Sequence, residues 1–192
     1  MSTLKNNIIE TFGFSENEFE SIKDFFEPLE IKKGEYFLEQ GKYVRKLGFV
    51  ERGILREFLV VNGKEVTKWF STSGYFAVDL SGFLKKRKSR VSYQALNDTS
   101  LFTISREDYA KIGNTIPKWD KLEKLFLIKC FSILEDRVIS HLSMNAEERF
   151  NQLFDFQPML FNQVPLKYLA SMLRMTPETL SRIRHRVSEI DS

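Results

Sequence analysis

The distribution of glycine divides this chain of 192 residues into two parts. Seven of the nine glycines lie between Gly34 and Gly82, the last is Gly113, and residues 114–192 contain none. Glycine permits the tight turns that join short strands, whereas a long stretch without it favours helices. We therefore expect a β-rich domain over residues 1–113 and helical structure over residues 114–192.

Segments rich in Val, Phe and Tyr predict six strands in the β-rich part. They cover Glu35–Glu39, Lys46–Glu51, Ile54–Val61, Glu65–Ser71, Val91–Leu96 and Thr99–Ser105. Asn62-Gly63 separates the third strand from the fourth and suits a type I′ hairpin turn, because both residues tolerate a positive φ. The spacing predicts an antiparallel β-roll, which a helix over Arg106–Ile112 closes.

The stretch before Gly34 predicts two short helices. The second begins at the capping box Ser15–Glu18, and its expected inner face carries Phe19, Ile22, Phe25 and Phe26. With 18 Phe and 42% hydrophobic residues, the chain has enough apolar side chains to form a packed core.

Composition excludes several classes of protein. The single cysteine, Cys130, excludes a disulfide framework within one chain. The amino terminus has no apolar signal region, and no apolar run reaches about 18 residues, the length of a membrane span. We therefore expect a cytoplasmic protein with no membrane partner. The net charge of +3 is too small to indicate a partner by itself.

Residues 118–142 predict one long helix that is apolar nearly all round. Such a helix needs cover on more than one side, and the roll together with the same helix of a second subunit would supply it. We therefore expect a central dimerisation helix over residues 114–143. The candidate interface residues of this homodimer are Leu122, Phe126, Ile133 and Leu134. A helix buried inside one monomer is the alternative.

Residues 144–192 predict a helical domain. A second capping box, Asn145–Glu148, indicates that the long helix ends near Ser143, at a candidate hinge, and that another helix follows through Phe154. Further along, one apolar stripe is formed by Leu166, Leu169, Ala170 and Leu173. Thr176 then suits an N-cap and Pro177 the first position of a new helix. Two short helices joined by a tight turn are typical of a helix-turn-helix.

The turn and the second helix have a distinctive composition. Arg174 stands where such turns usually carry Gly, so a left-handed backbone there would cost about 1 kcal/mol. The inner face of the second helix is predicted to carry Leu180, Ile183 and Val187, and the opposite face Glu178, Ser181, Arg182 and His185. Arg can pair with O6 and N7 of guanine, and Glu can accept from N4 of cytosine, so this outer face suits a major groove.

The charge around these two helices favours a polyanion. From Pro165 to Val187 there are five Lys or Arg and one acidic residue. The candidates for contacts with DNA phosphates are Lys167, Thr176, Arg184 and Arg186. A protein partner for the same helices is the alternative.

The order of roll, long helix, hinge and helix-turn-helix resembles the catabolite-activator (cyclic-AMP receptor, Crp/Fnr) family of bacterial transcription regulators over nearly the whole chain. The most specific stretch is Pro177–Ile183, because this family has a Glu and an Arg that contact bases at the positions of Glu178 and Arg182. Pro177 replaces another Arg of many members, which leaves the target sequence open. The resemblance implies a double-stranded β-helix in an α+β fold, with duplex DNA, a second subunit and RNA polymerase as partners. Because the chain stops at Ser192, we expect the wing to be reduced or absent.

The family also has a phosphate cassette that holds a cyclic nucleotide, and the resemblance places it at residues 74–91. Arg90 aligns with the Arg that binds the phosphate, which suits a bidentate contact. Val78 and Asp79 stand where a Gly-Glu pair is expected, and Val91 replaces a Ser. We therefore expect a degenerate site whose effector is unknown or absent, with the candidate pocket residues Asp79, Arg87 and Arg90. A regulator that binds a cyclic nucleotide through an atypical site is the alternative.

The densest run of charge lies in the same stretch and consists of Lys85, Lys86, Arg87, Lys88 and Arg90. This run fits a solvated loop, an anion site for another phosphorylated effector, or a second contact with the DNA backbone. The pattern of charge alone does not choose among the three.

An enzyme built on the roll is the main alternative of another class. Metal-dependent rolls of the cupin kind need His and carboxylate ligands inside the barrel. The two histidines, His141 and His185, lie outside it on this assignment. We expect His141 on a helix surface and His185 facing DNA, with haem ligation by His141 as a further alternative. The sequence therefore predicts no catalytic residue, metal site or cofactor.

Overall fold

The structure is a computed structural model that describes the backbone of residues 2–190 and the side chains of residues 3–186. It divides into two compact units, Met1–Lys129 and Cys130–Ser192. The division falls inside helix α5 (Trp119–Ser143), so each unit is described by itself.

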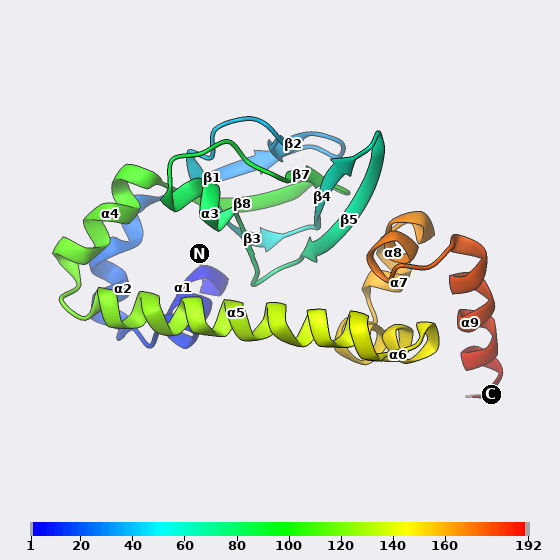
Figure 1. Ribbon diagram of the computed structural model, residues 1–192. Helices are drawn as coiled ribbons and strands as arrows, with labels where there is room; N and C mark the ends of the chain where they lie inside the picture. Colours follow the sequence, from blue (N-terminus) through cyan, green and yellow to red (C-terminus); the bar gives the residue numbers. More distant parts are fainter. Residues whose placement is uncertain (1, 191–192) are drawn as a thin grey trace. The chain divides into compact units, whose positions relative to one another are not determined.

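The amino-terminal unit contains a β-roll with helices at its ends (Figure 1). In chain order its elements are α1 (Ser2–Phe12), α2 (Glu16–Ile22), the 3₁₀ turn η1 (Lys23–Phe25), β1 (Phe26–Ile31), β2 (Tyr36–Leu38), β3 (Lys46–Arg52), β4 (Leu55–Val61), β5 (Lys64–Ser71), β6 (Phe76–Ala77), α3 (Leu80–Leu84), β7 (Ser92–Ala95), β8 (Thr99–Ser105) and α4 (Arg106–Thr115). The strands form two antiparallel sheets of four, in the orders β1-β8-β3-β6 and β2-β7-β4-β5. The expected fold class, an antiparallel roll in an α+β protein, is confirmed.

The six predicted strands are all present, but β1 and β6 were not predicted. The second helix was expected to include Phe26, and this is wrong, because α2 ends at Ile22 and Phe26 begins β1 at the edge of a sheet. Pro28 suits that position, since an edge strand leaves one side without ladder hydrogen bonds. The capping box Ser15–Glu18 is confirmed. The turn at Asn62-Gly63 is also confirmed, with φ values of 50° and 75°.

Helices α1, α4 and the start of α5 cover the sheet β1-β8-β3-β6 through aromatic side chains. The Phe12 ring lies 4.8 Å from that of Phe126 and 5.4 Å from that of Trp119, measured between centroids. Phe76 of β6 meets Phe126 edge-on at 5.4 Å. Such rings supply a large part of the apolar surface that folding buries in this unit.

The carboxy-terminal unit contains the rest of α5 and four further helices, α6 (Ala146–Phe156), α7 (Leu160–Gln163), α8 (Leu166–Met172) and α9 (Pro177–Ile190). The helix break and the capping box Asn145–Glu148 are confirmed, whereas α7 was not predicted. The rings of Phe150 and Phe161 pack edge to face at 5.0 Å and join α6 to α7. This small core holds α8 and α9 in place.

Candidate nucleic-acid interface and effector cradle

The turn between α8 and α9 has a left-handed backbone at a residue that is not Gly. Arg174 has a φ of 54°, in the left-handed region, so the expected cost of about 1 kcal/mol applies. The N–H of Met175 donates to the carbonyl of Ala170 (3.0 Å) and that of Arg174 to Ser171 (3.2 Å), which closes the end of α8. These hydrogen bonds set the direction in which α9 leaves the turn.

Helix α9 begins at its predicted cap and buries its predicted inner face. The hydroxyl of Thr176 accepts a hydrogen bond from the N–H of Thr179 (3.2 Å), and Pro177 is the first helical residue. Leu180 and Ile183 are buried, together with Leu169 of α8. The side chain of Val187, the third predicted inner residue, lies outside the described residues.

The opposite face of α9 is exposed at all four predicted base-reading positions, Glu178, Ser181, Arg182 and His185. Hydrogen bonds from the Thr176 hydroxyl and from the helix N-terminus, with the charge of Arg182, hold the pKa of the Glu178 carboxyl below its usual value. The guanidinium of Arg182 lies 3.4 Å from the hydroxyl of Thr179. One turn of helix therefore presents an ionised acceptor and a charged donor side by side.

The residues predicted to contact DNA phosphates differ in the contacts that they make within the chain. Lys167 is exposed, with its ammonium 4.9 Å from the centre of the Tyr168 ring. Arg184 donates to the carbonyl of Phe161 (3.3 Å) and so ties α9 to α7. Arg186 forms an ion pair with Glu147 of α6 (3.1 Å). An Arg has five N–H donors, so one such contact leaves others for a phosphate.

His141 joins α5 to the end of α8, a role that sequence reasoning missed. It was expected on a helix surface, but it is half-buried, with Nδ1 3.0 Å from the carbonyl of Arg137 and Nε2 3.2 Å from that of Met172. Arg149 of α6 donates to the next carbonyl, that of Leu173, at 2.9 Å. Two side chains thus hold the start of the turn.

The candidate interface residues on α5 fall into two groups. Leu122 and Phe126 are only 9% and 7% exposed, because the aromatic core of the amino-terminal unit covers them. Their assignment to a dimer interface is therefore corrected, since a covered side chain has no surface to bury against a partner. Ile133 and Leu134 are 47% and 48% exposed. In the carboxy-terminal unit, exposed apolar residues recur every three or four positions along the helix and form a stripe of Phe131, Leu134, Val138 and Leu142.

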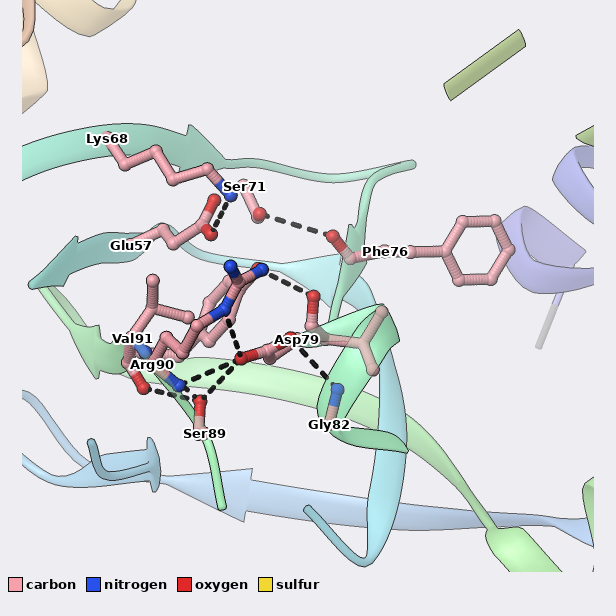
Figure 2. Close-up of polar contacts among 11 residues, drawn as sticks. Glu57, Lys68, Ser71, Phe76, Asp79, Gly82, Ser89, Arg90 and Val91 are labelled. Atoms are coloured by element: carbon pink, nitrogen blue, oxygen red, sulfur yellow. Dashed lines mark hydrogen bonds and ion pairs between the residues drawn. The ribbon is translucent and has the colours of Figure 1, made fainter. Parts of the chain in front are cut away.

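The candidate effector residue Asp79 caps α3 from inside the roll. One carboxylate oxygen accepts from the N–H of Gly82 (3.1 Å), and the other from the N–H of Arg90 (2.8 Å), with the hydroxyl of Ser89 at 3.4 Å (Figure 2). Burial opposes ionisation of this side chain, but these hydrogen bonds and the charge of Arg90 outweigh it, so the pKa of Asp79 is lowered. We call Asp79, Gly82, Ser89 and Arg90 the cradle. Its N–H donors, those of Gly82 and Arg90, are already occupied by the charged carboxylate of Asp79.

The other two effector candidates point outward. The side chain of Arg90 is 80% exposed, with Nε 3.9 Å from the Asp79 carboxylate, and Arg87 is exposed as well. The sequence placed Asp79 and Arg90 in one site, and the structure brings these two together. Arg87 contacts the cradle through its backbone, since its N–H donates to the carbonyl of Gly82 (2.9 Å). Among the residues that the structure describes, its side chain makes no hydrogen bond or ion pair to the cradle.

A second buried carboxylate, Glu57 of β4, was missed because a single acid in an apolar strand carries no motif. Its Oε1 lies 2.5 Å from the ammonium of Lys68. Tyr93 donates to the carbonyl of Val78 (3.1 Å), and burial, followed by the charge of Glu57 and then that of Asp79, raises the pKa of this phenol. Both carboxylates therefore act on one buried phenol, and both raise its pKa.

Two absences can be stated for the described part of the chain. No three side chains among His, Cys, Asp and Glu come together there as a metal ion would require. No helix there is long and apolar enough to cross a membrane.

Comparison with known proteins finds a domain model and solved structures that are similar to this chain. Residues 28–115 match the family model of the cyclic nucleotide-binding domain. The chain is similar to the catabolite activator protein of Thermus thermophilus (TM-score 0.60, 21% identity, 96% of this chain and 88% of that one). It is also similar to FixK2 of Bradyrhizobium japonicum (0.71, 17%, 86% of each chain) and to the c-di-GMP responsive global regulator CLP of Xanthomonas campestris (0.67, 13%, 92% and 93%). No curated protein matches the chain in sequence. At these identities the likeness shows a shared fold.

Proposed function

We propose that this chain, which has the fold of the Crp/Fnr family and carries a cyclic nucleotide-binding domain at residues 28–115, regulates transcription as a DNA-binding homodimer. Bacterial DNA lies in the cytoplasm, so this is where we expect the protein to act. RNA polymerase is the further partner that such a role implies. The proposal assigns no catalytic residue.

The observation that carries the proposal is the division of α9 into two faces. Leu180 and Ile183 hold the helix against α8, while Glu178 and Arg182 stand exposed one turn apart. Exposed Arg and Glu on a short second helix suit guanine and cytosine edges in a major groove. Major-groove reading by α9, with Ser181 and His185 as further contacts, is therefore the function that this geometry favours.

The exposed stripe of α5 supports dimerisation. Isolated exposed apolar residues are common on monomers, but a continuous stripe along one helix is typical of a contact surface. Burying side chains of this size in a second copy would stabilise the dimer by about 1.5–3 kcal/mol each. We place the interface on Phe131, Leu134 and Val138 of this stripe, with Ile133 as a further candidate beside Leu134.

The cradle supports a degenerate effector site. A cyclic nucleotide would need donors for its phosphate, and Asp79 already takes the N–H groups of Gly82 and Arg90. The buried negative charge of Asp79 would also repel the phosphate. We therefore expect calorimetry with cyclic AMP to show no binding in the micromolar range, and micromolar binding would favour the atypical working site instead.

Selection of bound duplexes from a random pool tests the function. A dimer with two α9 helices should enrich a palindrome whose half-sites lie about 10 base pairs apart, centre to centre. Phe131→Glu should separate the subunits in sedimentation and lose that enrichment, whereas the control Phe131→Leu should keep both. If the parent protein enriches no sequence at all, the proposed function is wrong.

A further inference from the structure

Two neighbouring loops of the amino-terminal unit gather positive charge on one surface. Residues 40–45 and 85–90, here called the basic loop pair, contain no Asp or Glu. Seven exposed cations lie on them: Lys42, Arg45, Lys85, Lys86, Arg87, Lys88 and Arg90. Within the described part of the chain, Arg90 is the one member of this set with an ion pair, to Asp79.

Backbone hydrogen bonds hold the two loops together. The N–H of Gly41 donates to the carbonyl of Ser89, and the N–H of Ser89 to that of Lys42, both at 2.8 Å. Tyr43 and Lys88 form an antiparallel bridge. The basic loop pair is therefore a fixed surface, unlike the freely solvated loop that a run of like charges suggests.

Arg106 fastens the loops from α4. Its guanidinium donates to the carbonyl of Phe83 (2.7 Å), just before the second loop, and to the carbonyl of Val44 in the first. Lys86 adopts a left-handed backbone, with a φ of 53°, which is unfavourable for a side chain of its kind. Mutual repulsion of the cations also opposes this arrangement. Because neither feature stabilises the fold, the arrangement points to a partner that neutralises the charge.

The composition of the surface indicates the chemistry of that partner. Cores of protein interfaces are depleted in Lys, which supplies four of the seven cations. Membrane-surface segments combine basic residues with several apolar ones, whereas Tyr43 is the one exposed apolar side chain of the described loop pair. Exposed Lys side chains on a polar surface are typical of contacts with the phosphates of nucleic acid.

We infer that the basic loop pair is a second DNA contact, which binds backbone phosphates without reading sequence. This inference rests on the proposed function, since it concerns the same duplex DNA. The contact supplies affinity and salt dependence, while α9 supplies discrimination between sequences. It assigns to the amino-terminal unit a role in DNA binding that needs no small-molecule effector.

A charge reversal with a matched control tests this contact. The variant Lys86→Glu/Lys88→Glu changes the loop pair, whereas Lys33→Glu/Lys64→Glu changes two exposed lysines elsewhere and lowers the net charge equally. Binding is measured by fluorescence anisotropy at several salt concentrations, on a duplex limited to the selected site and on one extended by about 15 base pairs at each end. The milder Lys86→Gln/Lys88→Gln serves if the reversed variant does not fold as judged by circular dichroism.

The loop variant should lose about tenfold in affinity on the extended duplex, and its salt slope should fall by about two for each subunit, with the short duplex unchanged. The control should bind both duplexes like the parent. Equal losses for the two variants, or a parent protein that binds both duplexes equally, would overturn the inference. So would a loop variant that loses only its binding to phosphatidylglycerol vesicles, which would make the surface a membrane contact.

Arg182→Ala on the short duplex separates this inference from the proposed function. If the short duplex shows no sequence preference that depends on Arg182, the proposed function itself fails. If that preference is present and the loop variant matches the control on the extended duplex, only the second contact fails.

Discussion

Helices α3 and α9 both begin at a capping side chain, but only α9 leaves the residues next to its cap available to a ligand. Asp79 caps α3 with a buried charge, and its two oxygens take the N–H of Gly82 and of Arg90. Thr176 caps α9 with a neutral, exposed hydroxyl, and Glu178 in the first turn stands in solvent. The negative charge at the start of α3 is thus buried within the chain, whereas the negative charge at the start of α9, that of Glu178, is exposed to a partner.

Among the substitutions that test this difference between α3 and α9, the largest effect is expected at Asp79, on the stability of the fold. Asp79→Ala should lower the free energy of unfolding of the amino-terminal unit by about 3 kcal/mol, because two N–H groups would lose their acceptor. Urea unfolding followed by the fluorescence of Trp69 and Trp119, which both lie in that unit, measures it. The control Asp79→Asn keeps one acceptor oxygen and should lose less. An Asp79→Ala protein as stable as the parent would show that the carboxylate does not hold the cradle.

The next effect is on DNA binding by α9. Arg182→Ala should weaken the preferred duplex by about 2 kcal/mol and a scrambled duplex much less, without changing stability, because its side chain is exposed. Arg184→Ala should weaken both duplexes alike, lower the salt slope by about one, and also destabilise the unit, since it loses the hydrogen bond to Phe161. Anisotropy titrations on the two duplexes make the comparison. Equal losses on both duplexes for both variants would mean that α9 does not read sequence.

A smaller effect is expected at the neutral cap. Thr176→Ala should destabilise the start of α9 by about 1 kcal/mol, because the N–H of Thr179 loses its acceptor. Hydrogen exchange at the Thr179 amide measures this local change. Thr176→Ser keeps the hydroxyl and should exchange like the parent, and a similar rate in the Ala variant would show that the cap contributes nothing.

The smallest expected effect is a change in the stability of the fold at low pH. The pKa of Asp79 is lowered in the folded protein, so its carboxylate stabilises the fold fully above the unfolded value of about 3.9, and this contribution is lost as pH falls through the folded value. The stability advantage of the parent over Asp79→Asn should therefore be constant from pH 7 to about 5 and shrink below about pH 4. Urea unfolding at several pH values measures the advantage, and an unchanged advantage at pH 3 would contradict the assigned role of the charge.

Features that depend on a few adjacent residues could be predicted from the sequence. The capping boxes at Ser15–Glu18 and Asn145–Glu148, the turn at Asn62-Gly63 and the start of α9 at Pro177 are all confirmed. Each rests on hydrogen bonds or dihedral preferences within about four positions, which the order of the residues contains. The left-handed backbone at Arg174 was expected only on the condition that the usual turn is kept, and the structure keeps it.

Features that depend on distant partners could not be predicted in the same way. β1 and β6 exist because β8 and β3 offer them ladder hydrogen bonds, and neither strand has a strong pattern of its own. The apolar pattern of α5 predicted a helix that needs cover, but it did not show which residues the amino-terminal unit covers. That unit buries Leu122 and Phe126 and leaves Leu125 exposed.

The sequence by itself determined that an antiparallel roll precedes a long helix and a helix-turn-helix, and it determined the two faces of α9. These follow from periodicity and from local caps. Only the tertiary structure decided that Asp79 closes the cradle, that His141 holds the end of α8, and that the loops at residues 40–45 and 85–90 form one charged surface. The physical reason is that a side chain's role depends on the donors and charges around it, and folding brings these from distant parts of the chain.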